Sequence, residues 1–133
     1  MAPHAAVPDA ALPSLAGVQV LVVDDHDDTR QMFDQALGLA GAVVSLATSA
    51  REALGYLDRV AVIVTDYAMP GETGLWLLER VLERARPVPV ILVTGYADLY
   101  AKQLATAPFA RVLRKPVDPL QLCTVVAAVL GMV

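Results

Sequence analysis

Short apolar runs that stop at polar residues are the feature that most constrains the fold of this chain. Residues 20–23 are all Val or Leu, and Asp24 and Asp25 follow them directly. Runs of this length are typical of strands that are buried on both faces, as in a parallel sheet. Further runs stop in the same way: 60–65 at Asp66, 90–93 at Thr94, and the shorter 111–114 at Lys115.

Segments with helical periodicity alternate with these runs. Their start signals are a capping box at 28–31, a second at 49–52, and Asp118 followed by Pro119. Strand–helix units with short connections predict a parallel sheet with helices on both faces, joined by right-handed crossovers. The expected strands are 18–23, 42–47, 60–65, 89–94 and 110–114, and the expected helices are 28–40, 50–58, 73–85, 97–106 and 118–130.

The small number of strands restricts the architecture. A closed barrel of parallel strands needs about eight of them. We therefore expect an open α/β fold: a flavodoxin-like, doubly wound, five-stranded parallel sheet of order 2-1-3-4-5 with five helices. In such sheets, ligands bind just beyond the carboxyl ends of the strands, at the point where the strand order reverses. That point lies between the first and third strands.

This order predicts that the polar residues at the strand ends meet. Asp24 and Asp25 end the first strand and Asp66 ends the third, so the three carboxylates should converge. Thr94 and Lys115 are expected beside them, at the solvent edge of their strands. Neighbouring carboxylates repel and raise one another's pKa, and a hard divalent cation relieves that repulsion. The sequence therefore predicts a cation-binding acidic site at this edge.

Composition excludes other classes of protein. The formal net charge is −4, and no cluster of Lys and Arg could follow a nucleic-acid backbone. No segment approaches the roughly 20 apolar residues of a membrane span, so we expect no membrane contact. A single cysteine cannot form an internal disulfide, which fits the reducing cytosol, so we expect a cytoplasmic location. The single Cys123 lies in an apolar helical pattern and is interpreted as a small buried hydrophobe.

The first residues differ from the rest of the chain. Residues 1–17 are rich in Ala and Pro, lack periodicity, and do not have the pattern of a signal peptide. We expect them to be a disordered tail or a linker, and 18–133 to be one domain. With 133 residues in all, the chain is long enough for a core of its own.

The polar residues fall in four short motifs. They are Val-Val-Asp24-Asp25, Asp66-Tyr-Ala-Met-Pro70-Gly71, Thr94-Gly95 and Lys115-Pro116. In this order, on an alternating strand–helix pattern, they resemble the receiver domain of two-component response regulators. The resemblance extends from about residue 18 to 129. It implies a phosphoacceptor module that receives a phosphoryl group from a histidine kinase or a histidine phosphotransfer protein.

The resemblance also implies a role for each matching residue. Asp66 would be phosphorylated, and the cofactor would be Mg²⁺. The ligands of Mg²⁺ would be Asp25 and Asp66 through their side chains, Ala68 through its backbone carbonyl, and Asp24 through a water. Thr94, Gly95 and Lys115 would bind the phosphoryl oxygens, and Pro116 is a candidate for a cis peptide bond. We expect no catalytic residues beyond these, and His26 is interpreted as a solvated side chain.

Several alternatives remain open at this stage. The chain could be a stand-alone regulator, which we favour, or a receiver domain from a hybrid histidine kinase. An Asp-nucleophile, Mg²⁺-dependent phosphohydrolase would need a second acid two residues after Asp66, where Ala68 stands. We therefore expect no enzyme, apart from assistance to the protein's own phosphorylation and dephosphorylation.

The surface for partners is predicted from the last helix. Apolar residues run nearly all round 118–130, so one face should remain for another protein or a homodimer mate, together with 97–106 and 110–114. Val112 stands where the family often has an aromatic residue that moves with Thr94. Without it, we expect activation to change 95–106 more than 110–114.

Overall fold

The computed structural model of this chain describes residues 13–95, 104 and 106–132. Its centre is a parallel sheet of the order β2-β1-β3-β4-β5, as predicted. The strands are β1 (Gln19–Val23), β2 (Val43–Ala47), β3 (Val62–Asp66), β4 (Val90–Thr94) and β5 (Arg111–Arg114). The helices of the described part are α2 (Asp27–Leu39), α3 (Ala50–Ala53), the 3₁₀ helix η1 (Leu54–Tyr56), α4 (Gly74–Leu82) and α6 (Pro119–Val129). Most of the helix expected over 97–106 lies outside the described residues.

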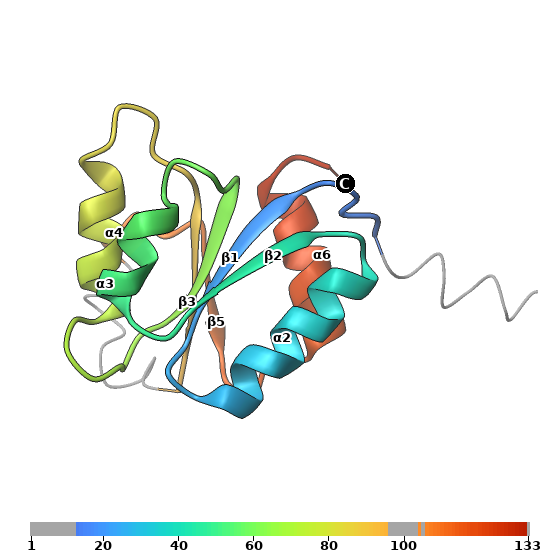
Figure 1. The fold of residues 1–133 in the computed structure, drawn as a ribbon, viewed down its shortest axis with the longest axis horizontal. Coiled ribbons are helices and arrows are strands. Elements are labelled where there is room, and N and C mark those ends of the chain that lie inside the picture. The colour runs from blue at the N-terminus through green and yellow to red at the C-terminus, as the bar shows by residue number, and fades with distance from the viewer. Residues whose placement is uncertain (1–12, 96–103, 105, 133) are drawn as a thin grey trace, which may run out of the picture.

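The helices form two layers around the sheet. Figure 1 shows α2 and α6 on one side of the strands, and α3 and α4 on the other. Alternate residues of the strands face these two layers, so that Val20 and Val22 contact the α2/α6 side while Leu21 and Val23 contact the α3/α4 side. All four are at most 1% exposed, which confirms that the run 20–23 is a strand buried on both faces.

The outer strand β5 is less buried than the sequence pattern predicts. Arg111, Val112 and Arg114 are exposed, and Leu113 is half-buried. The reason is that β5 lies at the edge of the sheet, where it has a neighbour on one side only. Charged side chains on an edge strand also disfavour pairing with another chain.

Two of the three helix N-caps predicted from the sequence are present in the structure. Ser49 Oγ accepts a hydrogen bond from Glu52 N, and Asp118 Oδ1 accepts one from Leu120 N. The box predicted at 28–31 is wrong, because α2 begins at Asp27 and its N-cap is His26, without a side-chain cap. Both Asp27 and Asp28 then lie in the first turn, where carboxylates interact favourably with the helix dipole.

Two helices end several residues before the expected position. The segment expected as a helix over 50–58 is helical only to Ala53 and continues as one 3₁₀ turn, and α4 ends at Leu82 rather than 85. The apolar residues Leu77, Leu78 and Val81 form the buried stripe of α4. Residues 83–86 lie beyond that stripe and are exposed, so no packing extends the helix.

The last helix, α6, is covered more completely than predicted. Leu122, Cys123, Val125, Val126 and Ala127 are all buried among residues of α2 and the sheet. Only a narrow face remains, and its exposed residues are Leu120, Gln121, Thr124 and Ala128. A broad apolar partner face on this helix is therefore not present. The interpretation of Cys123 as a small buried hydrophobe is confirmed, since it is 0% exposed.

The packed part of the chain begins before residue 18. Leu15 is 0% exposed, and its backbone N–H donates to Ala40 O at 2.7 Å. The close approach requires glycine at position 41, where φ is +101° and an added Cβ would lie 2.9 Å from Ala16 Cα. Residues 13–17, which we expected to belong to the tail, thus cover the amino ends of β1 and β2. The rest of the expected tail, 1–12, lies outside the described residues.

No helix among the described residues is long and apolar enough to cross a membrane.

Candidate functional site

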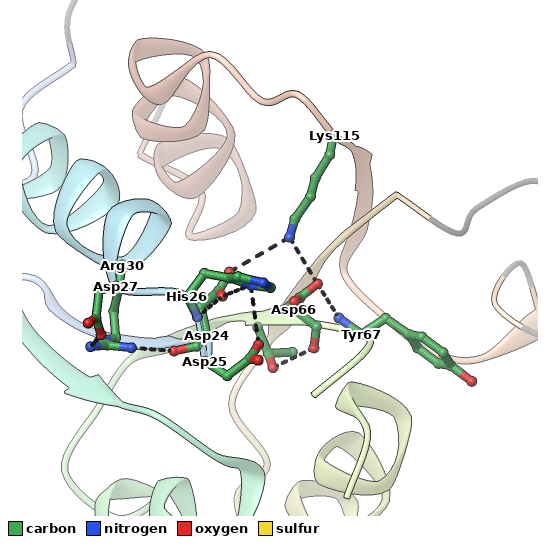
Figure 2. A network of polar contacts seen from close by, with 9 residues as sticks. Asp24, Asp25, His26, Asp27, Arg30, Asp66, Tyr67 and Lys115 are labelled. Carbon is green, nitrogen blue, oxygen red and sulfur yellow. Dashed lines mark hydrogen bonds and ion pairs between the residues drawn. The ribbon is translucent and has the colours of Figure 1, made fainter. Parts of the chain in front are cut away.

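Three carboxylates meet at the carboxyl edge of the sheet. Val23 of β1 is aligned with Thr65 of β3, so the residues that follow, Asp24 and Asp66, end adjacent strands. Asp25 comes next along the chain. Figure 2 shows the three side chains close together, with Lys115 reaching toward them from the end of β5. The convergence that the strand order predicts is therefore present in the structure.

Asp24 is held by hydrogen bonds within its own loop. It is 2% exposed, and its Oδ1 accepts a hydrogen bond from His26 N at 2.8 Å. Its backbone carbonyl accepts one from the Arg30 guanidinium, also at 2.8 Å. Arg30 makes an ion pair with Asp27 as well, so one guanidinium joins the end of β1 to the first turn of α2. These contacts fix the direction in which the acid pair points.

Asp66 is buried, which is unusual for a charged side chain. It is 4% exposed, and its Oδ1 accepts a hydrogen bond from Tyr67 N at 2.8 Å. Lys115 Nζ lies 3.3 Å from the same oxygen and 3.9 Å from Asp24 Oδ2. Burial raises the pKa of Asp66 above its ordinary value of 3.8, Lys115 lowers it, and Asp24 raises it further. The effect of burial on this pKa is larger than that of Lys115, so a further positive charge would stabilise the ionised form of Asp66.

The loop after Asp66 is held by packing rather than by charge. Met69 is buried among residues of the α3/α4 layer, and Gly74 N donates to Tyr67 O at 2.9 Å. A Cβ at Gly74 would lie 2.4 Å from Asp66 O, so only glycine allows α4 to approach β3 this closely. Ala68, the predicted carbonyl ligand, lies half-buried in this loop. Gly74 lies within the helix expected over 73–85, and that expectation carried no sign of this contact.

Thr94 and Lys115 lie side by side at the ends of β4 and β5. The backbone N–H of Lys115 donates to Thr94 O at 3.0 Å, and the Lys115–Pro116 peptide bond is cis. Thr94 is 0% exposed, so its expected place at the solvent edge is wrong. It follows Val93, the residue aligned with Asp66 on the neighbouring strand. Gly95 follows as an exposed bend.

The acidic site has the donors that a divalent cation needs. One oxygen of Asp25, Oδ1, is buried and has no hydrogen-bond partner within the described part of the chain. Asp24, Asp25, His26 and Asp66 each offer a ligand atom, and these atoms lie within 4.8 Å of one another. Carboxylate oxygens suit Mg²⁺, which usually binds through one or two carboxylates and keeps several waters. The residues present therefore fit the cation that the sequence predicted.

The His26 ring lies close to the carboxylates, although a solvated side chain was expected at this position. Its Nδ1 lies 3.3 Å from Asp24 Oδ1 and 3.4 Å from Asp25 Oδ1. The side chain is 65% exposed, so the interpretation as a solvated group describes only its outer part. In the sequence, His26 directly follows Asp24 and Asp25, and this position was the available signal for a contact. The turn that directs the ring toward the carboxylates depends on the hydrogen bond from His26 N to Asp24 Oδ1.

Comparison with known proteins identifies the class to which this fold and site belong. The sequence profile of the response regulator receiver domain matches residues 20–127. The chain belongs to that family. It is a receiver domain of a two-component response regulator, a phosphoacceptor domain.

Individual relatives agree with this family. An uncharacterized 14.6 kDa protein of Leptolyngbya boryana is 40% identical over 120 residues, which cover 86% of this chain and 92% of that protein. The C4-dicarboxylate transport transcriptional regulatory protein DctD of Rhizobium meliloti is 41% identical over 86 residues. That match covers 63% of this chain but 19% of DctD, so the likeness concerns one part of the longer regulator.

Solved structures show the same fold. The chemotaxis response regulator CheY4 of Vibrio cholerae has a TM-score of 0.77 at 29% identity, covering 86% of this chain and 99% of that one. A response regulator receiver domain protein of Clostridium thermocellum has a TM-score of 0.78 at 28% identity, covering 86% and 94%. The flavodoxin-like prediction is confirmed by these likenesses and by the strand order.

Proposed function

We propose that Asp66 accepts a phosphoryl group from the phosphohistidine of a histidine kinase or a phosphotransfer protein. The observation that carries the proposal is the setting of Asp66: a buried carboxylate, next to Asp24, with Lys115 Nζ 3.3 Å away. A buried acid beside a second acid has no stabilising role of its own, because each disfavours ionisation of the other. Such a carboxylate can instead serve as a ligand of a cation and as the acceptor of a phosphoryl group.

In the transfer step, an oxygen of the Asp66 carboxylate attacks the phosphorus atom. The P–N bond to the donor histidine breaks, its electron pair returns to the imidazole, and a P–O bond to Asp66 forms. Lys115 balances negative charge on the phosphoryl oxygens, and the Thr94 hydroxyl donates a hydrogen bond to one of them. The backbone amides near Ala68 and Gly95 complete the set of donors.

A bound Mg²⁺ would supply positive charge that offsets repulsion between the carboxylates and the incoming phosphoryl oxygens. Asp25 and Asp66 would hold it through side-chain oxygens, Ala68 through its carbonyl, and Asp24 through a water. Asp25 Oδ1 is buried and has no hydrogen bond within the described part of the chain, and this supports the assignment, since a buried carboxylate oxygen without a hydrogen bond is costly.

The protein acts on itself and on its partners rather than on a small substrate. Ala68 occupies the position two residues after Asp66 where a phosphohydrolase of this chemistry needs an acid. We propose a stand-alone regulator whose signal passes from Thr94 to 95–106, β5 and α6. Within the described part of the predicted partner surface, Val112 and Leu120 are exposed large apolar side chains, at 39% and 55%. Val126 of α6 lies in the core, and Val129 is half-buried.

The experiment is phosphorylation by acetyl phosphate with and without Mg²⁺, followed by mass mapping of the hydroxylamine-sensitive adduct. We expect one phosphoryl group on Asp66 that requires Mg²⁺ and is absent from Asp66→Asn. Asp28→Asn, an exposed acid in the first turn of α2, is the control and should label normally. Undiminished labelling of Asp66→Asn would refute the proposal.

A further inference from the structure

His26 stands apart from the other residues at the site because it is a nitrogen donor among carboxylates. Its Nδ1 lies 3.3 Å from Asp24 Oδ1 and 3.4 Å from Asp25 Oδ1. Figure 2 shows the ring directed toward the carboxylate cluster from the first turn after β1. The second of these oxygens, Asp25 Oδ1, is the buried atom without a hydrogen-bond partner in the described chain.

The separations fit two ligands of one metal ion. For an ion with bonds of about 2.1 Å, adjacent donors lie about 3.0 Å apart in an octahedron and about 3.4 Å apart in a tetrahedron. The distance of 3.4 Å from His26 Nδ1 to Asp25 Oδ1 falls within this range, allowing for small adjustments. An ion held by Asp25 would therefore find the imidazole within reach without movement of the backbone.

The backbone of His26 is held in place, which fixes the position from which its side chain extends. His26 N donates to Asp24 Oδ1 at 2.8 Å, and the residue is the N-cap of α2, with extended backbone angles. The Arg30 guanidinium donates a hydrogen bond to the backbone carbonyl of Asp24 and forms an ion pair with Asp27. Only the two side-chain torsions of His26 remain free, so little conformational entropy is lost when the ring binds an ion.

We propose that His26 is an imidazole ligand of the cation bound by Asp25 and Asp66, which shifts the preference of this site from Mg²⁺ toward first-row transition-metal dications. The inference rests on the proposed cation site. Carboxylate and water ligands suit Mg²⁺ and Mn²⁺, whereas imidazole favours metals such as Co²⁺, Ni²⁺ and Zn²⁺. A receiver with this donor set would bind Co²⁺ more tightly than its carboxylates alone allow.

The direct test detects nitrogen bound to the metal. Mn²⁺ is added to the full chain, and electron spin echo envelope modulation measures coupling between the ion and ¹⁴N. We expect coupling from one directly bound imidazole, and its loss in His26→Ala. The chain has only one other histidine, so His4→Ala is the matched control and should keep the coupling. Circular dichroism confirms that each variant is folded.

The second measurement concerns selectivity. Titration calorimetry gives the affinity of each protein for Mg²⁺ and for Co²⁺. We expect His26→Ala to lose at least about tenfold in Co²⁺ affinity, since loss of even an outer-shell partner of a metal typically costs roughly 10–100-fold. The affinity for Mg²⁺ should change by less than about threefold, because this ion gains little from nitrogen. His4→Ala should change neither.

The outcomes separate this inference from the proposed function. Mn²⁺ binding that Asp25→Asn weakens, without nitrogen coupling in the unmodified chain, would overturn the role of His26 and leave the cation site in place. It would mean that the ring only pairs with Asp24. Absence of any binding, or binding indifferent to Asp25→Asn, would overturn the cation site itself and the inference with it.

Discussion

Two loops carry the acidic site, and they are held in different ways. The loop between β1 and α2 is joined by polar side chains: Arg30 and His26 contact Asp24, and Arg30 also contacts Asp27. The loop between β3 and α4 is positioned by close packing, with Met69 buried and Gly74 against the backbone of Asp66. The difference shows that two kinds of substitution can disrupt the acidic site. One removes a charged side chain from the β1–α2 loop, and the other adds a larger side chain to the β3–α4 loop.

The largest effect is expected from Gly74→Ala. The new Cβ would lie 2.4 Å from Asp66 O and 3.0 Å from Leu92 Cδ1, so strand β3 or helix α4 must shift. We expect a loss of about 3 kcal/mol in the free energy of unfolding, the upper end for overpacked sites, and reduced phosphorylation. Urea denaturation and acetyl phosphate labelling measure the two effects.

Gly38→Ala is the matched control for this substitution. Gly38 lies inside α2 with nothing within 4 Å of an added Cβ. Alanine there should stabilise the protein by up to about 1 kcal/mol through helix propensity. Equal stability changes of the same sign at both glycines would show that the contact with Asp66 does not hold the second loop.

The next largest effect is expected from Arg30→Ala in the first loop. The guanidinium is 15% exposed and donates to the carbonyl of Asp24, and a hydrogen bond involving a charged group contributes roughly 1.5–3 kcal/mol. We expect a loss of about 2 kcal/mol in stability and weaker binding of Mn²⁺. Arg51→Ala removes a guanidinium that is 71% exposed and should cost far less in both measurements. Normal metal binding by a destabilised Arg30→Ala protein would mean that Arg30 supports the fold but not the acid pair.

A smaller effect is expected at the start of α4. Thr73 Oγ1 accepts a hydrogen bond from Trp76 N, and loss of such a cap typically costs about 1 kcal/mol. Thr73→Ala should lower stability by that amount and also alter the fluorescence change of Trp76 on phosphorylation. Ser49→Ala removes the equivalent cap of α3 and should lower stability without the second effect. If both variants changed the fluorescence response alike, α4 would have no special link to Asp66.

The smallest effect, and one of opposite sign, concerns pH. The folded state raises the pKa of Asp66, so it holds this proton more tightly than the unfolded chain does. Stability is then lost as pH rises from the ordinary value of 3.8 through the raised pKa. Asp66→Asn should therefore be more stable than the parent protein at pH 7 with a chelator present, and this advantage should shrink as the pH falls.

Thermal unfolding of the two proteins at several pH values checks the sign of this difference. Asp28→Asn, an exposed carboxylate outside the acidic site, should show little advantage at pH 7. Addition of Mg²⁺ should stabilise the parent protein more than Asp66→Asn. A parent protein more stable than Asp66→Asn at pH 7 without metal would mean that Lys115 outweighs the cost of burial.

The sequence was sufficient for the sheet and for the meeting of Asp24, Asp25 and Asp66, because both depend on repeated strand–helix units and on one topological rule. It was insufficient where tertiary contacts compete with local signals. The residues 28–31 match a capping box, yet the turn at Asp24 and His26 starts the helix earlier. Gly74 carries no local sign of its contact, which depends on how closely α4 approaches β3.

The same limit explains the errors about surface. An apolar pattern all round α6 does not say how far α2 and the sheet enclose it, and the structure encloses all but a narrow face. Thr94 follows an apolar run and was placed at the solvent edge, but it is fully buried. How far a residue is buried depends on the helices and strands packed around it. The periodicity of a single segment does not contain this information.

The packing of Leu15 has a mechanical consequence. Its contacts lie at the amino ends of β1 and β2, which the length of a five-residue strand separates by about 17 Å from the carboxylates. Burial of a leucine side chain stabilises by roughly 1.5–3 kcal/mol, so tension applied to the described chain at residue 13 would first act on this anchor. The acidic site is thereby insulated from forces on the amino-terminal side, and a tether attached there would leave phosphorylation undisturbed until Leu15 is pulled out.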